Sequence, residues 1–595
     1  MILAKNHHSQ FMEATKQKKG LLDGMFRSHF WDTKATSANV KMSERILGYV
    51  VGPFGVMMLQ SIVNSYFNQY LTDVLGFTVS KGLWVTSFMV LFPILSKLLD
   101  AITNVIMAKF VDKTTCKQGK LRPWFILSLP IIVISMMMLF CTPSMSAKAQ
   151  AVWIVISYNL FYSIGYTMWY MPYELSAALS TRNVKQRSKN SIAGQITKNM
   201  GTGTISILFP TILQAVCSLT NGNTKSGYML CMAIMCCIAV PLTFIQYFFT
   251  RERITEERRS TEEAETSKKV EEAPFMTQLK ACLQNKYWVM FIIMILVYQV
   301  LNAMRAVSQV YYSGWVVEGN AYGSYASIQA KFTMISMAPM GPMLFVIIPL
   351  INKFGRTKMN IIGAAMSLAG ALLALLNPGE TLPIYIGTGL SGMGSMTYIY
   401  TMMSFTGDVL DYVEYSKKIR VEGITAAFVG FMHSLANGMG LGLFNLGLMA
   451  TRYITPQRIG ESAKGVALYA DQNANAVNWI NFSYQGAIAL TALMFLVLFL
   501  FFFKIEREMP TVTNALTERK KAECAAKGIE YVSPQEQQKA EIEKQQAEAE
   551  EARIKELHER CEKKHLNFEE ENQKYLAKKA KKQARKAKRK AKKNQ

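Results

Sequence analysis

The stretch LWVTSFMVLFPILSKLLDAITNVIMAKFVDKTTCKQGKLRPWFILSLPIIVISMMMLF, residues 83–140, decides the fold. It holds two apolar runs, 83–110 and 123–142, and the segment 109–122 between them carries five Lys or Arg. Each run is about as long as a helix must be to cross the roughly 30 Å hydrocarbon core of a bilayer. Because backbone groups in lipid must bond within their own segment, the stretch predicts two membrane-spanning helices joined by a basic loop.

The same pattern recurs along the chain, in which 50% of residues are hydrophobic and only 18% charged. It predicts an all-α integral membrane protein with about twelve transmembrane helices. The predicted spans are 46–73, 83–110, 123–142, 150–177, 192–217, 227–250, 286–315, 329–352, 359–377, 383–410, 423–451 and 479–503.

Loop charges give an independent prediction of topology. Loops after even-numbered spans hold five, five, seven, three and three Lys or Arg, whereas those after odd-numbered spans hold one, one, one, none, none and three. Basic loops stay on the cytoplasmic side, so we expect both termini to be cytoplasmic in a multi-pass protein of the cell membrane.

The charged segment 251–285 divides the spans into two halves of six. We expect a cytoplasmic N-terminal segment at 1–45, helical halves at 46–250 and 286–505, a linker at 251–285 and a charged, helical cytoplasmic tail at 506–595. Halves of equal span number fit a transporter whose substrate site lies between them near mid-membrane.

The net charge of +25 owes much to the tail, where residues 578–593 hold eleven Lys or Arg. A solvated tail is the leading interpretation, contact with anionic lipid is the next, and nucleic acid is not expected as a partner. The nine cysteines show no metal-ligand spacing, and no nucleophile–base pattern occurs. An enzyme, a metal site and a bound cofactor are therefore not expected, although Na⁺ or H⁺ remains a candidate coupling ion.

Polar side chains within a span are costly, so they are candidates for function. The first span carries Gln60, Asn64 and Asn68 on one helical face, suited either to sugar hydroxyls or to bonds between helices. The second span carries Lys97, Asp100 and Asn104 on one face. Asp100 and Asn104 are candidates for cation coupling, and a structural ion pair of Asp100 with Lys97 is the alternative.

The fourth span has tyrosines at 162, 166 and 170 followed by Glu174, each four residues apart. Aromatic rings stack on the apolar faces of sugars and carboxylates accept their hydroxyls, so Tyr166, Tyr170 and Glu174 are candidate binding residues. Packing and interfacial anchoring are the alternative.

Two further spans carry a charged or titratable residue. Arg305 in the seventh needs a counter-charge such as Asp100 or Glu174, or binds an anionic substrate. His433 in the eleventh is a candidate binding or proton-carrying residue, with helix packing as the favoured alternative.

Charged residues near the cytoplasmic span ends are candidates for gating. Networks of this kind lock one state of a carrier and break as its halves rock. The candidates are Asp112, Lys120 and Arg122 after the second span, and Asp408, Asp411 and Arg420 after the tenth.

Four strings are similar to the signature segments of one family: YLTDVLG (70–76), DAITNVIMAKFVDKTTCKQGKLRPW (100–124), MPYEL (171–175) and GDVLDYVEYSKKIRVEG (407–423). In order and spacing they resemble the glycoside–pentoside–hexuronide:cation symporters, the melibiose-permease-like branch of the major facilitator superfamily. The resemblance covers about 46–505. It implies alternating access and uptake of glycosides, with sodium or protons as coupling ions.

The charged site of the melibiose-permease branch is altered here. By the resemblance, its two span-2 carboxylates fall on Asp100 and Asn104, and its span-2 Arg falls on Lys97. Its remaining charged site residues fall on other residue types, at Met57, Tyr170, Gln195 and Ser434, and its span-4 Trp falls on Glu174. One carboxylate beside an amide offsets less of the dehydration of a sodium ion than two carboxylates do. Cation coupling is therefore expected to be weaker, relocated or absent.

The leading prediction is a secondary active transporter of a sugar or glycoside, with a uronide among the candidates because of Arg305, driven by cation symport. The alternatives are an uncoupled facilitator, a lipid-type carrier of the same fold, and a transporter-derived sensor that signals through its tail.

Overall fold

The computed structural model has two compact units, Met1–Ala35 with Met42–Thr517 and Thr36–Lys41 with Glu518–Gln595. Two predicted gating groups, Arg420 and the side chain of Asp112, lie outside the described residues, as does the basic run 578–593. The described residues are 22, 24–26, 28–37, 39–114, 116–181, 183–220, 223–260, 274–338, 340–419, 421–461 and 467–526, with short pieces between 547 and 577.

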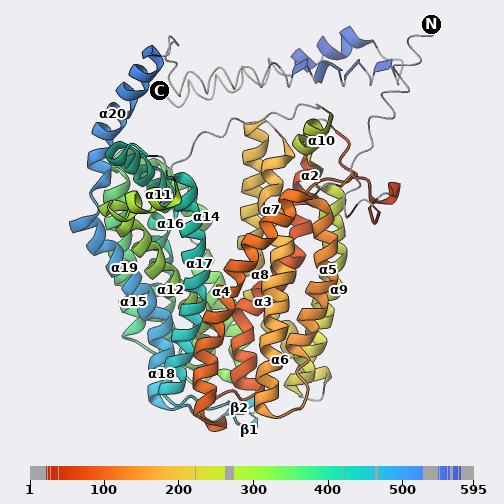
Figure 1. Ribbon diagram of the computed structural model, residues 1–595. Coiled ribbons are helices and arrows are strands. Elements are labelled where there is room, and N and C mark those ends of the chain that lie inside the picture. The colour runs from red at the N-terminus through yellow and green to blue at the C-terminus, as the bar shows by residue number, and fades with distance from the viewer. Residues whose placement is uncertain are drawn as a thin grey trace. The chain divides into compact units, whose positions relative to one another are not determined.

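The first unit contains two groups of helices side by side, coloured red to yellow-green and green to blue (Figure 1). The first group is extended by π-helical segments at Leu47–Val51, Tyr70–Val74 and Leu160–Tyr166. Its helices are α2 (Met42–Ile46), α3 (Gly52–Gln69), α4 (Leu83–Lys113), α5 (Arg122–Phe140), α6 (Ala147–Asn159), α7 (Thr167–Ser180), α8 (Val184–Leu219), α9 (Thr224–Phe249) and α10 (Arg253–Ser260).

The second group follows the linker and ends in α20 (Ile505–Ala526), whose last residues belong to the second unit. Strands β1 (Arg458–Glu461) and β2 (Ala467–Tyr469) pair antiparallel in one of its loops. Two π-helical segments, Phe482–Gly486 and Leu498–Phe502, flank α19. The other helices are α11 (Phe275–Leu283), α12 (Lys286–Trp315), α13 (Tyr325–Met337), α14 (Met340–Phe354), α15 (Arg356–Leu375), α16 (Thr381–Lys417), α17 (Glu422–Ala450), α18 (Ala474–Asn481) and α19 (Ala487–Val497).

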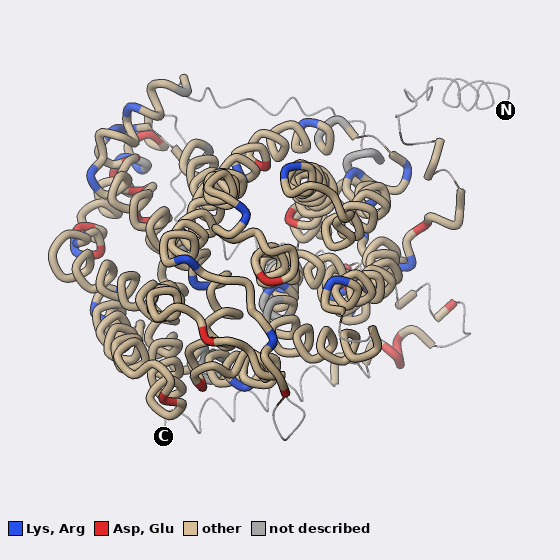
Figure 2. The backbone as a smooth tube through the Cα atoms, turned by 90° about the horizontal axis from the view of Figure 1, so that it is seen from below, with Lys and Arg blue, Asp and Glu red and all other residues tan. Residues whose placement is uncertain are grey.

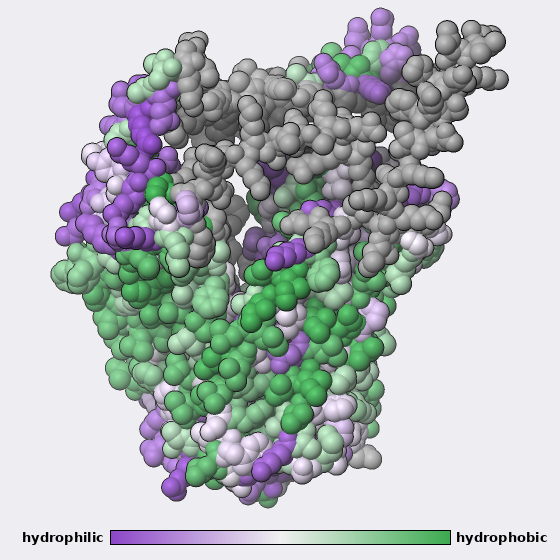
Figure 3. Space-filling model, viewed as in Figure 1, coloured by the Kyte–Doolittle hydropathy of each residue, from purple (hydrophilic) through white to green (hydrophobic). Residues whose placement is uncertain are grey.

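Among the described residues, nine helices are long and apolar enough to cross a membrane. The predicted spans 150–177, 329–352 and 383–410 fall on helices that are not among these nine, so twelve crossings remain a prediction. Figure 3 shows a wide apolar band across the visible face of the helices, with polar residues gathered toward their ends. Seen from below, charged residues are sparse among the helices (Figure 2). Both views fit a protein surrounded by lipid.

Helix α4 of the first group contacts helix α17 of the second group beside a proline of α4. Pro93 lies inside α4 and has no N–H, so the Met89 carbonyl lacks the partner that a regular helix supplies. Asn445 of α17 donates its side-chain amide to that carbonyl at 3.0 Å. The approach needs glycine, because a Cβ at Gly438 or Gly442 would lie 2.8 Å from a backbone oxygen of α4.

In each group, a glutamate that follows the last helix long and apolar enough to cross a membrane caps an earlier helix of the same group. Glu252 accepts hydrogen bonds from the backbone N–H groups of Lys120, Leu121 and Arg122 at 2.8–3.0 Å, where α5 begins. Glu506 accepts them from Arg356 at 3.0 Å and Thr357 at 2.8 Å, where α15 begins. A carboxylate at a helix N-terminus satisfies free N–H groups and complements the helix dipole. The two groups therefore share one internal plan.

Burial by itself would raise the pKa of Glu506, but the hydrogen bonds from Thr357 and Arg356 outweigh it and lower the pKa. A lowered folded pKa stabilises the protein above the unfolded pKa, and this contribution is lost as pH falls through the folded pKa. We expect Glu506→Gln to lower the free energy of unfolding by about 1–2 kcal/mol at neutral pH.

The measurement is the thermal midpoint of the detergent-solubilised protein between pH 7 and pH 3.5. The difference between Glu506→Gln and the native chain should begin to shrink below about pH 4.3, the pKa of a glutamate in an unfolded chain, and should go on shrinking as pH falls through the lower folded pKa of Glu506. Glu518→Gln is the matched control, because its side chain is 72% exposed. A difference that stays constant across this range would contradict the capping role.

Candidate functional site

A cavity of about 330 Å³ lies between the two groups of helices, with walls from α3, α4, α6, α7, α12 and α17. Its volume falls within the roughly 300–1,000 Å³ of small-molecule sites. It brings together seven of the predicted site residues, namely Gln60, Asn64, Asp100, Asn104, Tyr166, Tyr170 and His433. Glu174 and Arg305 are not among its lining residues.

Four tyrosines of the fourth predicted span line this cavity in a row. In a regular helix, four residues turn about 40° more than one full turn, so side chains spaced four apart drift gradually around the helix. The π-helical segment Leu160–Tyr166 has wider turns and counters this drift. Tyr166 and Tyr170 stack with ring centroids 5.2 Å apart, and Tyr158 and Tyr162 continue the row.

The polar face of the first span divides between two tasks. Gln60 and Asn64 line the cavity, and the Asn64 carbonyl accepts a hydrogen bond from the Tyr162 hydroxyl. Asn68 is 4% exposed and donates to the Tyr311 hydroxyl on α12 at 3.0 Å. Gln60 and Asn64 are thus placed for contact with a substrate, and Asn68 for contact between helices. These are the two alternatives that the sequence left open.

Asp100 forms an ion pair with Lys97 at 2.8 Å, and its other oxygen accepts a hydrogen bond from the Ser163 hydroxyl. The Lys97 ammonium also lies 3.6 Å from the centre of the Tyr162 ring. Asn104 accepts a hydrogen bond from Thr167 at 3.2 Å. A cation of the chain itself therefore occupies one side of the predicted coupling carboxylate.

Glu174 and His433 have partners that the sequence did not reveal. Glu174 forms an ion pair with Lys198 of α8, whose ammonium lies 3.2 Å from the Tyr170 hydroxyl. Lys198 falls within the predicted span 192–217 and was not among the candidate site residues. His433 is exposed to the cavity and its Nδ1 lies 2.8 Å from the Gln299 amide nitrogen.

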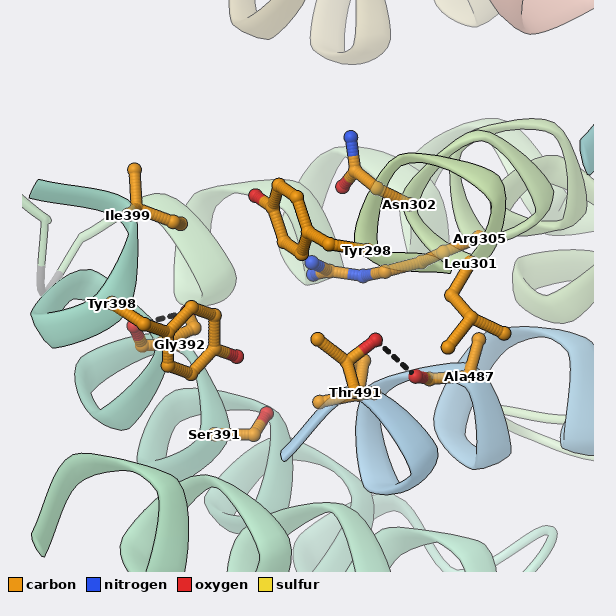
Figure 4. Close-up of a pocket in the computed structure, with 12 residues that line it drawn as sticks. Tyr298, Leu301, Asn302, Arg305, Ser391, Gly392, Tyr398, Ile399, Ala487 and Thr491 are labelled. Atoms are coloured by element: carbon orange, nitrogen blue, oxygen red, sulfur yellow. Dashed lines mark hydrogen bonds between the residues drawn. The ribbon is translucent and has the colours of Figure 1, made fainter. Parts of the chain in front are cut away.

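Arg305 lies in a separate cavity within the second group, lined from α12, α16 and α19. Its guanidinium is 3.3 Å from the Tyr484 hydroxyl. In the described part of the chain it forms an ion pair with neither Asp100 nor Glu174, the partners considered from the sequence. Figure 4 shows it between Tyr298 on one side and Tyr398 and Thr491 on the other.

Of the predicted gating residues, Arg122 and Asp408 have partners within their own helical group. Arg122 is 2% exposed and donates to the backbone carbonyls of Gln118, Tyr247 and Trp31. Asp408 forms an ion pair with Arg356 at 2.7 Å. Lys120 and Asp411 also have interactions, and the gating role of all these residues remains a prediction.

The sequence reasoning missed the contacts that join the groups at the end carrying β1 and β2. Asp73, in the string YLTDVLG, accepts hydrogen bonds from Tyr322 and, at 3.1 Å, from Tyr453, both of the second group. Thr455 donates to the backbone carbonyl of Thr72 at 3.0 Å. Position near a span end was the available signal, since Asp73 lies in the last turn of its span. These contacts close the central cavity at this end.

Comparison with known proteins agrees with this architecture. The family described as MFS/sugar transport protein matches residues 48–507, which is most of the chain. The chain belongs to that family. This sugar-transport-family protein is 26% identical to the isoprimeverose transporter of Lactiplantibacillus pentosus, over 82% of this chain and 93% of that one.

The protein is also similar to the glucuronide carrier protein homolog of Escherichia coli strain K12. The two are 21% identical over 72% of this chain and 90% of that one. The crystal structure of a D-xylose–proton symporter matches with a TM-score of 0.51 at 13% identity, over 77% of this chain and 97% of that one. This likeness shows the fold. The predicted resemblance to glycoside:cation symporters is confirmed, and the protein is a multi-pass transporter of the cell membrane, not an enzyme.

Removing the Asp73 carboxylate is expected to open the closed end of the transporter. Hydrogen bonds to a charged group contribute about 1.5–3 kcal/mol, so Asp73→Ala should raise the population open at this end about tenfold or more. The readout is labelling of Asn437→Cys in the cavity by an impermeant maleimide added on the β1–β2 side, with the exposed Cys141 replaced by Ser.

Asp471→Ala is the matched control for Asp73→Ala. Asp471 is also an acidic residue near β2, but it bonds Asn320 at 2.7 Å within the second group. Labelling in this control should match the parent chain. Equal labelling in Asp73→Ala and the parent would show that Asp73 does not hold this end closed.

Proposed function

We propose that the protein carries a sugar or glycoside by alternating access, with the substrate bound in the central cavity. The cavity carries this proposal, because it joins a row of tyrosines to free amide groups at the junction of the two halves. The names of the two relatives, an isoprimeverose transporter and a glucuronide carrier homolog, support the same substrate class.

The two walls of the first half suit the two faces of a sugar. Tyr166 and Tyr170 present stacked rings to the cavity, and rings of this kind contact the C–H face of a pyranose. Gln60 and the amide nitrogen of Asn64 supply hydrogen-bond donors for its hydroxyls. Glu174 is proposed to act through Lys198 and the Tyr170 hydroxyl, because its own side chain does not line the cavity.

The closed end supports alternating access. Asp73 and its tyrosine partners join the halves at the β1–β2 end, which the loop charges predict to be extracellular. We propose that these bonds break when the substrate enters. The predicted gating network, including Arg122 and Asp408, would then form between halves at the opposite end.

The coupling ion depends on Asp100. Cation symport, with Na⁺ or H⁺ at Asp100, is the mode supported by the name of a further relative, a putative glycoside/cation symporter of Escherichia coli strain K12 that is 24% identical over 67% of this chain and 80% of that one. The Lys97–Asp100 ion pair favours a second candidate, an uncoupled facilitator, since the tethered ammonium competes with any free cation for the carboxylate. Glu174 and His433 are the alternative coupling residues, and of these His433 faces the same cavity.

A lipid-type carrier and a sensor have less support. An apolar groove of about 420 Å³ runs along α4 and α6, but none of its lining residues also lines the central cavity. Deletion of 510–595 separates the sensor from the carrier: a sensor loses signalling and keeps solute binding.

Uptake of a panel of neutral and acidic glycosides into proteoliposomes tests the proposed function. We expect Asn64→Leu and Tyr170→Leu each to lower kcat/KM for the transported sugar by about tenfold to a hundredfold, through lost hydrogen bonds or ring contact. Tyr400→Leu is the control, because Tyr400 is 41% exposed and outside the cavity. Uptake no greater than in empty liposomes across the whole panel would refute a sugar carrier.

Asn104→Asp is expected to create or strengthen sodium dependence. It places a second carboxylate one helical turn from Asp100, and two carboxylates offset more of the cost of dehydrating sodium. The readout is sugar uptake with sodium against potassium at equal ionic strength, where sodium should lower KM several-fold.

Asn437→Asp is the control for Asn104→Asp, since it adds a carboxylate to the same cavity from α17. An equal sodium response in both variants would argue against a coupling site at Asp100. Accumulation of sugar above equilibrium by the native protein, under an imposed sodium or proton gradient, would rule out the facilitator.

A further inference from the structure

The cavity around Arg305 differs from the central cavity in size and position. It measures about 40 Å³ and lies within the second half, between α12, α16 and α19 (Figure 4). A cavity of about 10–15 Å³ is enough to hold one water, so the Arg305 cavity has room for a few water-sized groups. The central cavity is about 330 Å³. The smaller cavity therefore suits a small ligand or one substituent of a larger ligand.

Arg305 has an unmatched charge in this cavity. A guanidinium carries five N–H donors, and the acceptor found for them is the Tyr484 hydroxyl at 3.3 Å. The ring of Tyr484 also lies 5.1 Å from the guanidinium carbon. Within the described part of the chain, no carboxylate forms an ion pair with Arg305. A charge at this depth in a membrane protein is costly unless an opposite charge or water neutralises it.

The surrounding hydroxyls divide into donors and acceptors. Ser391 and Thr491 donate to the helix carbonyls of Thr388 and Ala487, at 3.0 and 2.7 Å, and the second bond is drawn in Figure 4. Their protons are therefore engaged. The Tyr298 hydroxyl and the Asn302 amide line the same cavity and can donate to a ligand. Together with Arg305, they form a site rich in donors that lacks an acid.

We propose that the Arg305 cavity binds a small monovalent anionic group. The ligand chemistry is that of chloride or of a carboxylate, and its source is either a free anion or the acid group of a sugar acid. The free-anion source is independent of sugar transport. The sugar-acid source rests on the proposed function, with the ring in the aqueous space beyond Asn302, which is exposed.

Thermal unfolding of the purified full-length protein tests the site, in sodium chloride, sodium glucuronate or sodium MES at equal ionic strength. MES is too bulky for the cavity and serves as the reference anion. A ligand that binds the folded state raises the thermal midpoint saturably, and the titration gives its apparent Kd. The variants are Arg305→Gln, Tyr298→Phe and, as a control that removes an exposed positive charge, Lys148→Gln.

A free-anion site predicts that chloride raises the midpoint of the native chain above that in MES. Arg305→Gln should weaken the apparent Kd about tenfold or more, Tyr298→Phe about threefold, and Lys148→Gln not at all. A sugar-acid site predicts the same pattern for glucuronate alone. In that case Arg305→Gln should abolish uptake of acidic glycosides and retain uptake of neutral ones.

The proposal is overturned if neither chloride nor glucuronate stabilises the native chain beyond MES. It is also overturned if Tyr298→Phe and Arg305→Gln both leave the apparent Kd unchanged. Should Arg305→Gln not fold, the anion comparison on the native chain and Tyr298→Phe still decide. Failure of sugar uptake together with saturable chloride binding would reject the proposed function and keep the anion site.

Discussion

Inside the hydrocarbon layer, a polar group must find its partner in the protein, and the structure depends on this constraint. Pro93 leaves a carbonyl of α4 without its helical partner, and Asn445 of α17 supplies one from the other half. The same demand pairs Asp100 with Lys97 and Asp73 with two tyrosines. The contacts that hold the halves together thus satisfy polar groups that have no hydrogen-bond partner within their own helix.

Some polar contacts brace a single half, whereas others run between the two halves. Glu252, between α9 and α10, binds the start of α5, and Glu506, in the first turn of α20, binds the start of α15, so each half is braced internally. The bonds of Asp73 and Thr455 instead run between halves, at one end of the cavity. A rocking motion requires halves that stay rigid and contacts between them that can break. Opening then disrupts only the contacts between the halves.

The sequence predicted the helices and much of the cavity because periodicity decides which residues share a helical face. Gln60 and Asn64, and Tyr166 and Tyr170, were placed together by their four-residue spacing, and they line one cavity. The local π-helical turn that keeps the tyrosines in register leaves no such signal in the spacing.

What the sequence could not predict is the partner of each polar residue, since partners come from helices far apart in the chain. Lys198 meets Glu174 and Tyr322 meets Asp73 across 24 and 249 positions, as the numbering shows. For Arg305 the sequence left two partners open, an acid of the first half or an anionic substrate, and in the structure the side chain points into a cavity of its own. Spacing along a helix defines a face, and only packing defines what that face meets.

The walls of the central cavity have unequal chemistry. The first half presents amides, tyrosines and an ion pair, and α17 of the second half adds His433, Ser434 and Asn437, whereas α12 presents only Ala303, Ala306 and Val307. A wall of small apolar side chains discriminates little between hydroxyl patterns, yet it slides easily past a bound ring. On the proposed function, side chains of α3 and α7 would therefore select the substrate, and α12 would supply the surface that slides past it. A change of substrate would then need only a few substitutions in α3 and α7, with α12 unchanged.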